Sequence, residues 1–163
     1  MDNLANIETL HTIAQVAITL IGFSGIVVVF GERTADRWSS EEALSFYILI
    51  AGPLTALACS FVPILLSQLT SDSALVWRSS NAILGSAHLA NMIPFLIDRH
   101  GAKATIGQKV NAAIGITLIV AHFLAALNFL PWFTFIFIAG LLQQTWIGLH
   151  NFLLLFMARR QEE

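Results

Sequence analysis

The chain has 163 residues, of which 56% are hydrophobic and only 11% are charged, and its mean hydropathy is +0.75. Soluble domains carry charge on about a quarter of their residues, so this composition excludes an ordinary soluble domain and predicts an integral membrane protein. The net charge of −2 offers no basic surface for nucleic acid. The single cysteine, Cys59, excludes an internal disulfide and a thiolate zinc or iron–sulfur site.

The distribution of charge predicts the number of membrane crossings. The charged side chains all lie outside four stretches, 9–31, 43–71, 79–97 and 110–158. A crossing needs roughly 20 apolar residues, so the first three stretches supply one helix each and the fourth supplies two, separated at Pro131. We therefore predict an all-α transmembrane bundle of five helices that forms one domain, 1–163. The predicted spans are about 8–31, 42–69, 75–97, 109–130 and 132–157.

The first span, 8–31, combines an apolar arc with a polar one. At 100° per residue, six polar or small residues share about 100° of the helix: Glu8, His11, Thr12, Gln15, Thr19 and Gly22. Because lipid tails offer no hydrogen bonds, we expect this arc to face protein or trapped water, with Gln15 lining a cavity. Gly22 and Gly25 are predicted helix-packing positions. The flank before the span has two acids and no cation, which favours a retained helix over a cleaved signal peptide.

The second span, 42–69, carries a stripe of small residues. Gly52, Ala56 and Ser60 recur every four residues, a spacing that permits close helix packing. Pro53 and Pro63 each remove a backbone donor and are predicted to kink the helix. Ser39 and Glu42 have the spacing of a capping box, which would start the helix. Ser71-Asp72-Ser73 then predicts a turn, with a cap before the third span.

The last three spans direct neutral polar side chains to one side of each helix. The residues expected to face inward are Asn81, His88, Asn111, His122, Gln144 and Asn151. The segments 81–85 and 111–115 share the pattern Asn-Ala-x-x-Gly, which is too short to indicate a repeat. No acid or cation lies within the core of a span, which argues against a voltage sensor and against carboxylate-coupled transport.

The cations predict the orientation of the bundle. With five spans, Arg78 lies alone on one side of the membrane. The cations on the other side are Arg33, Arg37, Arg99, Lys103, Lys109, Arg159 and Arg160. By the positive-inside rule, the C-terminus is cytoplasmic and the N-terminus is outside.

Four histidines on four spans leave three interpretations open. His11, His88, His122 and His150 lie at depths of roughly 5, 20, 12 and 27 Å from the outer end of their spans. They could serve as interhelical hydrogen-bonding groups, as a conduit or proton relay, or as axial ligands of a b-type haem. For haem, the pairs closest in depth are His11 with His122 and His88 with His150, each differing by about 7 Å.

The opening span also carries a resemblance. Its runs Ala14-Gln15-Val16-Ala17 and Gly22-Phe23-Ser24-Gly25-Ile26, followed by Arg33, resemble the first span of a family of small uncharacterised bacterial multi-pass inner-membrane proteins. The resemblance covers about twenty residues. It implies a bacterial inner-membrane location and brings no activity with it.

The favoured hypothesis is a homo-oligomer with a channel-like conduit for a small polar solute or ion. Its predicted lining is Gln15, Asn81, His88, Asn111, His122, Gln144 and Asn151. The alternatives are a haem-b electron carrier that uses the intramembrane histidines, and an accessory or scaffold subunit of a larger membrane complex. The sequence has no G-x-S-x-G elbow and no H-E-x-x-H motif, so it does not indicate an enzyme.

Overall fold

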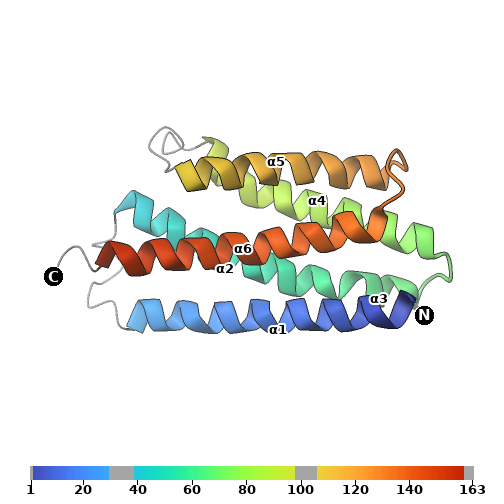
Figure 1. The fold of residues 1–163 in the computed structure, drawn as a ribbon, viewed down its shortest axis with the longest axis horizontal. Helices are drawn as coiled ribbons and strands as arrows, with labels where there is room; N and C mark the ends of the chain where they lie inside the picture. Colours follow the sequence, from blue (N-terminus) through green and yellow to red (C-terminus); the bar gives the residue numbers. More distant parts are fainter. Residues whose placement is uncertain (1, 30–38, 98–105, 160–163) are drawn as a thin grey trace.

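The computed structural model describes residues 2–29, 39–97 and 106–159, and these residues form helices and short turns with no strand among them (Figure 1). The all-α prediction is confirmed. The helices are α1 (Asp2–Val29), α2 (Ser40–Ser60), α3 (Val62–Ser67), α4 (Ser73–Ile97), α5 (Ile106–Ala126) and α6 (Phe133–Arg159). Because α3 continues the direction of α2, the described residues form five long helical segments (Figure 1). The start of α1 and the end of α6 lie at opposite ends of the bundle (Figure 1).

Within the part of the chain that the structure describes, four helical segments are long and apolar enough to cross a membrane. They are Asn6–Gly25, Glu42–Ser67, Ile106–Ala126 and Phe133–Met157. The remaining long helix, α4, has 25 residues but is not among these four. It carries Arg78 and a series of polar residues, including Asn81, His88 and Asn91. Of these polar residues, Asn81 and His88 are buried and Asn91 is half-buried.

Local signals in the sequence set the helix ends. The capping box is confirmed, since Ser39 accepts a hydrogen bond from the backbone of Glu42 and the Glu42 side chain accepts one from the backbone of Ser39. Asp72 caps α4 by accepting hydrogen bonds from the backbones of Ala74 and Leu75. The end of α5 comes four residues before the predicted end of its span at 130. There Asn128 has a φ of 68°, a left-handed conformation that commonly terminates helices.

The two prolines of α2 and α3 differ in their effect on the helix. The helix is interrupted at Phe61, and Pro63, one of the two positions predicted to kink it, lies in the first turn of α3. At Pro53, α2 continues as a helix. The Pro53 ring packs against Gly148 of α6, where an added Cβ would lie 2.7 Å from the Pro53 Cδ.

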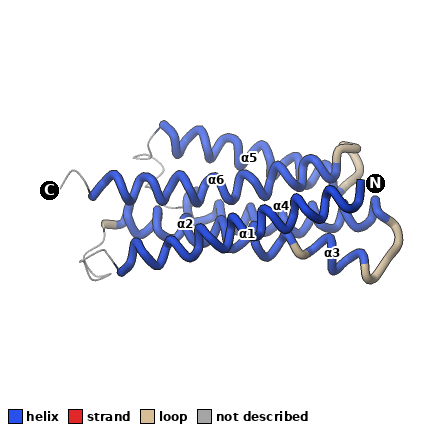
Figure 2. The backbone as a smooth tube through the Cα atoms, turned by 60° about the horizontal axis from the view of Figure 1, so that its bottom comes forward, coloured by secondary structure: helices blue, strands red, loops and turns tan. Residues whose placement is uncertain are grey.

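Two helical hairpins make up the described bundle apart from α1. The first hairpin contains α2, α3 and α4, and the second contains α5 and α6 (Figures 1 and 2). In each hairpin the first helix packs most extensively on the second helix of the other hairpin, so that α2 lies on α6 and α5 lies on α4. The burial patterns of α4 and α6 also match at a spacing of 60 residues. The matching buried pairs are 76/136, 77/137, 80/140, 81/141, 84/144, 85/145 and 88/148.

The first helix, α1, packs on the outside of this arrangement, mainly against α2 and also against α6. Its apolar arc faces inward, with Leu10, Ile13 and Ala17 buried in the main apolar core. The polar arc is exposed along its whole length. The prediction that this arc faces the interior of the bundle is therefore wrong within the single chain, because the apolar arc occupies that place.

Candidate functional site

A polar core lies inside the apolar bundle, and its best-connected member is Asn81 on α4. The Asn81 side chain is fully buried, and its Nδ2 donates to the carbonyls of Trp77 at 2.8 Å and Phe133 at 2.9 Å. Its Oδ1 lies 2.8 Å from Nδ1 of His122 on α5. One amide thus joins α4, α5 and the start of α6.

These contacts fix the protonation of His122. Because both hydrogens of the Asn81 amide are donated to carbonyls, its Oδ1 must accept, and His122 Nδ1 must carry the proton. The other ring nitrogen, Nε2, is then a buried acceptor without a hydrogen-bond partner among the described residues. It lies directly against Gly140, where a Cβ would overlap it. Gly85 also makes room for this ring, since a Cβ there would lie 2.9 Å from the His122 Cβ.

The second buried imidazole, His88, lies next to the first. The ring centroids of His88 and His122 are 6.3 Å apart. His88 is 1% exposed, and neither of its ring nitrogens has a hydrogen-bond partner among the described residues. Its Nε2 faces Gly115 of α5, where an added Cβ would lie 3.2 Å away. A buried polar group of this kind usually requires a water molecule or a ligand.

A small cavity adjoins His88 on the side away from His122. Its volume is about 60 Å³, and its polar lining consists of His88, Asn91, Gln108, Asn111, Gln144 and Asn151. A water molecule needs roughly 10–15 Å³ of such space, so a few waters fit. Two buried lining atoms, Gln144 Nε2 and Asn151 Oδ1, have no partner among the described residues.

The cavity belongs to one half of the bundle. Gln108 lies in the first turn of α5 and Phe95 in the last turn of α4. These helix ends lie opposite the start of α1 (Figure 1). From this end, polar groups continue through the cavity and His88 to His122, and Asn81 closes the series.

Amides also link the helices around the cavity. Asn91 donates to Thr55 Oγ1 of α2 at 2.8 Å and to Gln144 Oε1 of α6 at 3.4 Å. Asn111 accepts a hydrogen bond from Trp146 Nε1 at 3.1 Å, and its carbonyl accepts one from Gln143 at 3.3 Å. These bonds connect α2, α4, α5 and α6.

The structure thus brings most of the predicted lining together within one chain. Asn81, His88, His122, Gln144 and Asn151 are buried, and Asn111 is half-buried. Gln15 does not belong to this core, because it is exposed on α1.

The predicted helix-packing positions also fall into two groups, one buried between helices and one without contacts to other helices. Gly52, Ala56 and Ser60 are buried, and a Cβ on Gly52 would lie 2.7 Å from the Gln144 carbonyl oxygen. No atom of the described residues lies within 4 Å of a Cβ added at Gly22 or Gly25. The prediction that these two glycines pack against other helices is therefore wrong within the chain.

The predicted haem pairs do not form. The neighbouring imidazoles are His88 and His122, whereas His11 is exposed and His150 is half-buried. The cavity beside His88, at about 60 Å³, is far smaller than the roughly 300–1,000 Å³ of sites for small organic ligands and cofactors. Gly140 closes the space at His122 Nε2. Among the described residues there is no group of three or more His, Cys, Asp or Glu side chains that could hold a metal ion.

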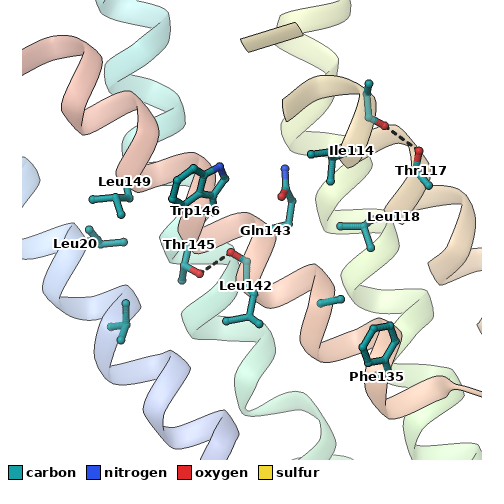
Figure 3. A pocket seen from close by; sticks show the side chains of 13 residues that line it. Leu20, Ile114, Thr117, Leu118, Phe135, Leu142, Gln143, Thr145, Trp146 and Leu149 are labelled. Carbon is teal, nitrogen blue, oxygen red and sulfur yellow. Dashed lines mark hydrogen bonds between the residues drawn. The ribbon is translucent and has the colours of Figure 1, made fainter. Parts of the chain in front are cut away.

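A larger groove lies on the outside of the bundle, along α6 between α1 and α5 (Figure 3). It has a volume of about 1,000 Å³ and begins at Val16 and Leu20 of α1. Most of its lining is apolar. The hydroxyl of Thr145 donates to the carbonyls of Leu141 and Leu142. Such a groove suits lipid tails or another helix and offers no catalytic group.

Comparison with models of protein families, with curated proteins and with solved structures finds no match to this chain. The candidate site therefore rests on the geometry of its own residues.

Sequence reasoning missed three members of the polar core: Thr55, Asn91 and Gln108. Asn91 lies at the edge of the inward arc of its helix, and its contacts with both α2 and α6 depend on how the hairpins pack. Gln108 precedes the predicted start of the fourth span by one residue. The available signal was the concentration of amides at one end of three spans.

Proposed function

We propose that this protein is a five-pass bacterial inner-membrane protein whose polar core, within a single chain, conducts protons through bound water. The single observation that carries the proposal is His88, a buried imidazole whose two ring nitrogens have no hydrogen-bond partner among the described residues and which lines a small cavity together with several amide side chains. Imidazole can accept a proton at one nitrogen and release one from the other. The proposed path runs from Gln108 through the cavity to His88 and then to His122.

The size and charge of the core favour protons over larger solutes. The cavity has room for a few waters, and its polar lining is made of amides and one imidazole. On the far side of His122, the bonds of Asn81 to two carbonyls close the path. Conduction therefore requires Asn81 to release His122, which makes the described conformation the closed one.

The orientation proposed from the cations places the open end of the path in the cytoplasm. Among the described cations, Arg78 lies near the end of the bundle that holds the start of α1, whereas Lys109 and Arg159 lie near the opposite end. The other cations, Arg33, Arg37, Arg99, Lys103 and Arg160, lie outside the described residues. By the positive-inside rule the Gln108 end is cytoplasmic.

The test is proton flux into liposomes that contain the purified protein and a trapped pH-sensitive dye. With a potassium gradient and valinomycin as the driving force, we expect acidification faster than in protein-free liposomes. Flux equal to that of protein-free liposomes at either sign of the potential would overturn the proposal.

A second candidate function, an accessory subunit that stabilises a larger membrane complex, is favoured by the interhelical amide bonds. Asn81, Asn91 and Asn111 each link two or more helices, as purely structural polar residues do in membrane bundles. In that case purification in mild detergent would recover a stable partner protein, and replacing His88 with Leu would leave the recovery unchanged.

A further inference from the structure

The exposed polar arc of α1 is the feature that the proton path leaves unexplained. Five of its residues follow alternating steps of four and three: Glu8, Thr12, Gln15, Thr19 and Gly22. These steps are the a/d seam of a left-handed coiled coil, the pattern by which one helix packs along another. Each of the five residues is exposed in the single chain. We call Thr12, Gln15, Thr19 and Gly22 the α1 seam.

The seam is costly to leave facing lipid. Its residues lie within Asn6–Gly25, one of the segments apolar enough to cross a membrane, and lipid offers no hydrogen bonds. The hydroxyls of Thr12 and Thr19 are satisfied locally, since they donate to the carbonyls of Glu8 at 2.9 Å and Gln15 at 2.7 Å. The Gln15 side chain has no hydrogen bond among the described residues. It is the one member of the seam that needs a partner from outside the chain.

The shape of the seam suits a second helix. Thr12, Thr19 and Gly22 are small, and nothing lies within 4 Å of a Cβ added at Gly22, so another backbone can approach closely. Val16 and Leu20 lie next to the seam and open onto the groove along α6 (Figure 3). A helix on the seam therefore also covers part of this apolar surface.

We propose that the α1 seam is the interface of a homodimer, in which α1 of a second copy packs in parallel against it. Two copies in one membrane share their orientation, so a twofold axis along the seam brings Gln15 of one copy to Gln15 of the other. A glutamine amide is both donor and acceptor, so the pair satisfies itself. The seam from Thr12 to Gly22 carries no charge, so it does not require a partner of opposite charge. Glu8 lies one turn earlier, at the outer end.

Cysteine cross-linking tests this interface directly. In a Cys59→Ala background, which removes the single and buried native thiol, cysteine replaces Thr12, Gln15 or Thr19 in membranes. The control is Ile116→Cys on α5, which is 47% exposed on a different surface. We expect oxidation to give a covalent dimer at the three seam positions and not at 116. Equal cross-linking at 116 and at the seam, or none at the seam, would overturn the proposal.

A binding measurement gives a second and independent test. Gln15→Leu removes the hydrogen-bonding pair, and we expect it to weaken dimerisation measured by energy transfer in liposomes by about fivefold or more. Gln15→Asn keeps a donor and an acceptor and should retain most of the affinity. An unchanged affinity in Gln15→Leu would contradict the interface. His88→Leu should leave dimerisation unchanged, so this proposal can fail separately from the proton path.

Discussion

Two glycines determine how the His122 ring fits into the polar core. A Cβ on Gly140 would overlap His122 Nε2, and a Cβ on Gly85 would lie 2.9 Å from the His122 Cβ. The ring cannot move away without giving up its hydrogen bond to Asn81. Gly140→Ala should therefore lower the free energy of unfolding by about 1–3 kcal/mol, the usual cost of overpacking a core. Thermal unfolding in detergent measures this effect.

The matched control is Gly25→Ala, because a Cβ at Gly25 meets no atom within 4 Å. In a helix, alanine is favoured over glycine by about 1 kcal/mol, so this variant should be as stable as the wild type or more stable. Equal losses in both variants would show that Gly140 does not hold the His122 pocket.

The sequence predicted the members of the polar core better than it predicted their partners. Helical phasing placed Asn81, His88 and His122 on inward faces, since an arc of neutral polar residues on an apolar helix needs a protein neighbour. The same argument failed for Gln15. Helical periodicity shows that α1 has a polar arc and an apolar arc, but it does not show which arc packs against the other helices of the same chain. The depths estimated from the sequence did not predict that His88 and His122 are neighbours. Those estimates count residues along each span and ignore how the helices tilt and shift relative to one another.

At the scale of elements, the end of α5 depends on Asn128. Its positive φ of 68° allows the backbone of Phe129 to donate to the Leu124 carbonyl at 2.9 Å and that of Asn128 to donate to Ala125 at 3.0 Å. A β-branched residue disfavours this conformation by about 1–2 kcal/mol. Asn128→Val should lower the midpoint of thermal unfolding, whereas Asn128→Gly should leave it nearly unchanged. A similar decrease in both variants would contradict this role.

The start of a helix could be predicted from the sequence where a side chain caps that helix. The capping box at Ser39 and the cap at Asp72 are both visible as short motifs, and α2 and α4 begin there. Pro131 pointed to the turn between α5 and α6, but α5 ends earlier because Asn128 leaves the helical conformation first. Asparagine adopts this conformation only in some contexts, so the sequence alone did not locate the stop.

At the scale of the whole molecule, the two hairpins share their arrangement but not their residues. Asn81 of α4 corresponds to Leu141 of α6, and His88 corresponds to Gly148. A buried position requires a side chain that fits its neighbours rather than a particular residue, which explains why residue identity did not reveal the correspondence. The short match between 81–85 and 111–115 relates α4 to α5, which are not corresponding helices.

The orientation of the bundle is testable with two exposed positions at opposite ends. Ser71 lies in the turn before α4, and Ile106 begins α5 and is 83% exposed. In the Cys59→Ala background, a membrane-impermeant thiol reagent added to intact cells with a permeabilised outer membrane should label Ser71→Cys and not Ile106→Cys. Permeabilising the inner membrane should expose both. The reverse labelling pattern would contradict the positive-inside assignment.

The central claim, that the polar core of one chain conducts protons through His88, is tested most directly by comparing two histidine variants in the liposome flux assay. His88→Leu removes the imidazole at the cavity, whose two ring nitrogens lack a hydrogen-bond partner among the described residues. His150→Leu changes a half-buried histidine whose Nε2 also lacks such a partner but which does not line the cavity. We expect the flux of His88→Leu to fall roughly tenfold or more and that of His150→Leu to stay near the wild-type value. Wild-type flux in folded His88→Leu would contradict the account.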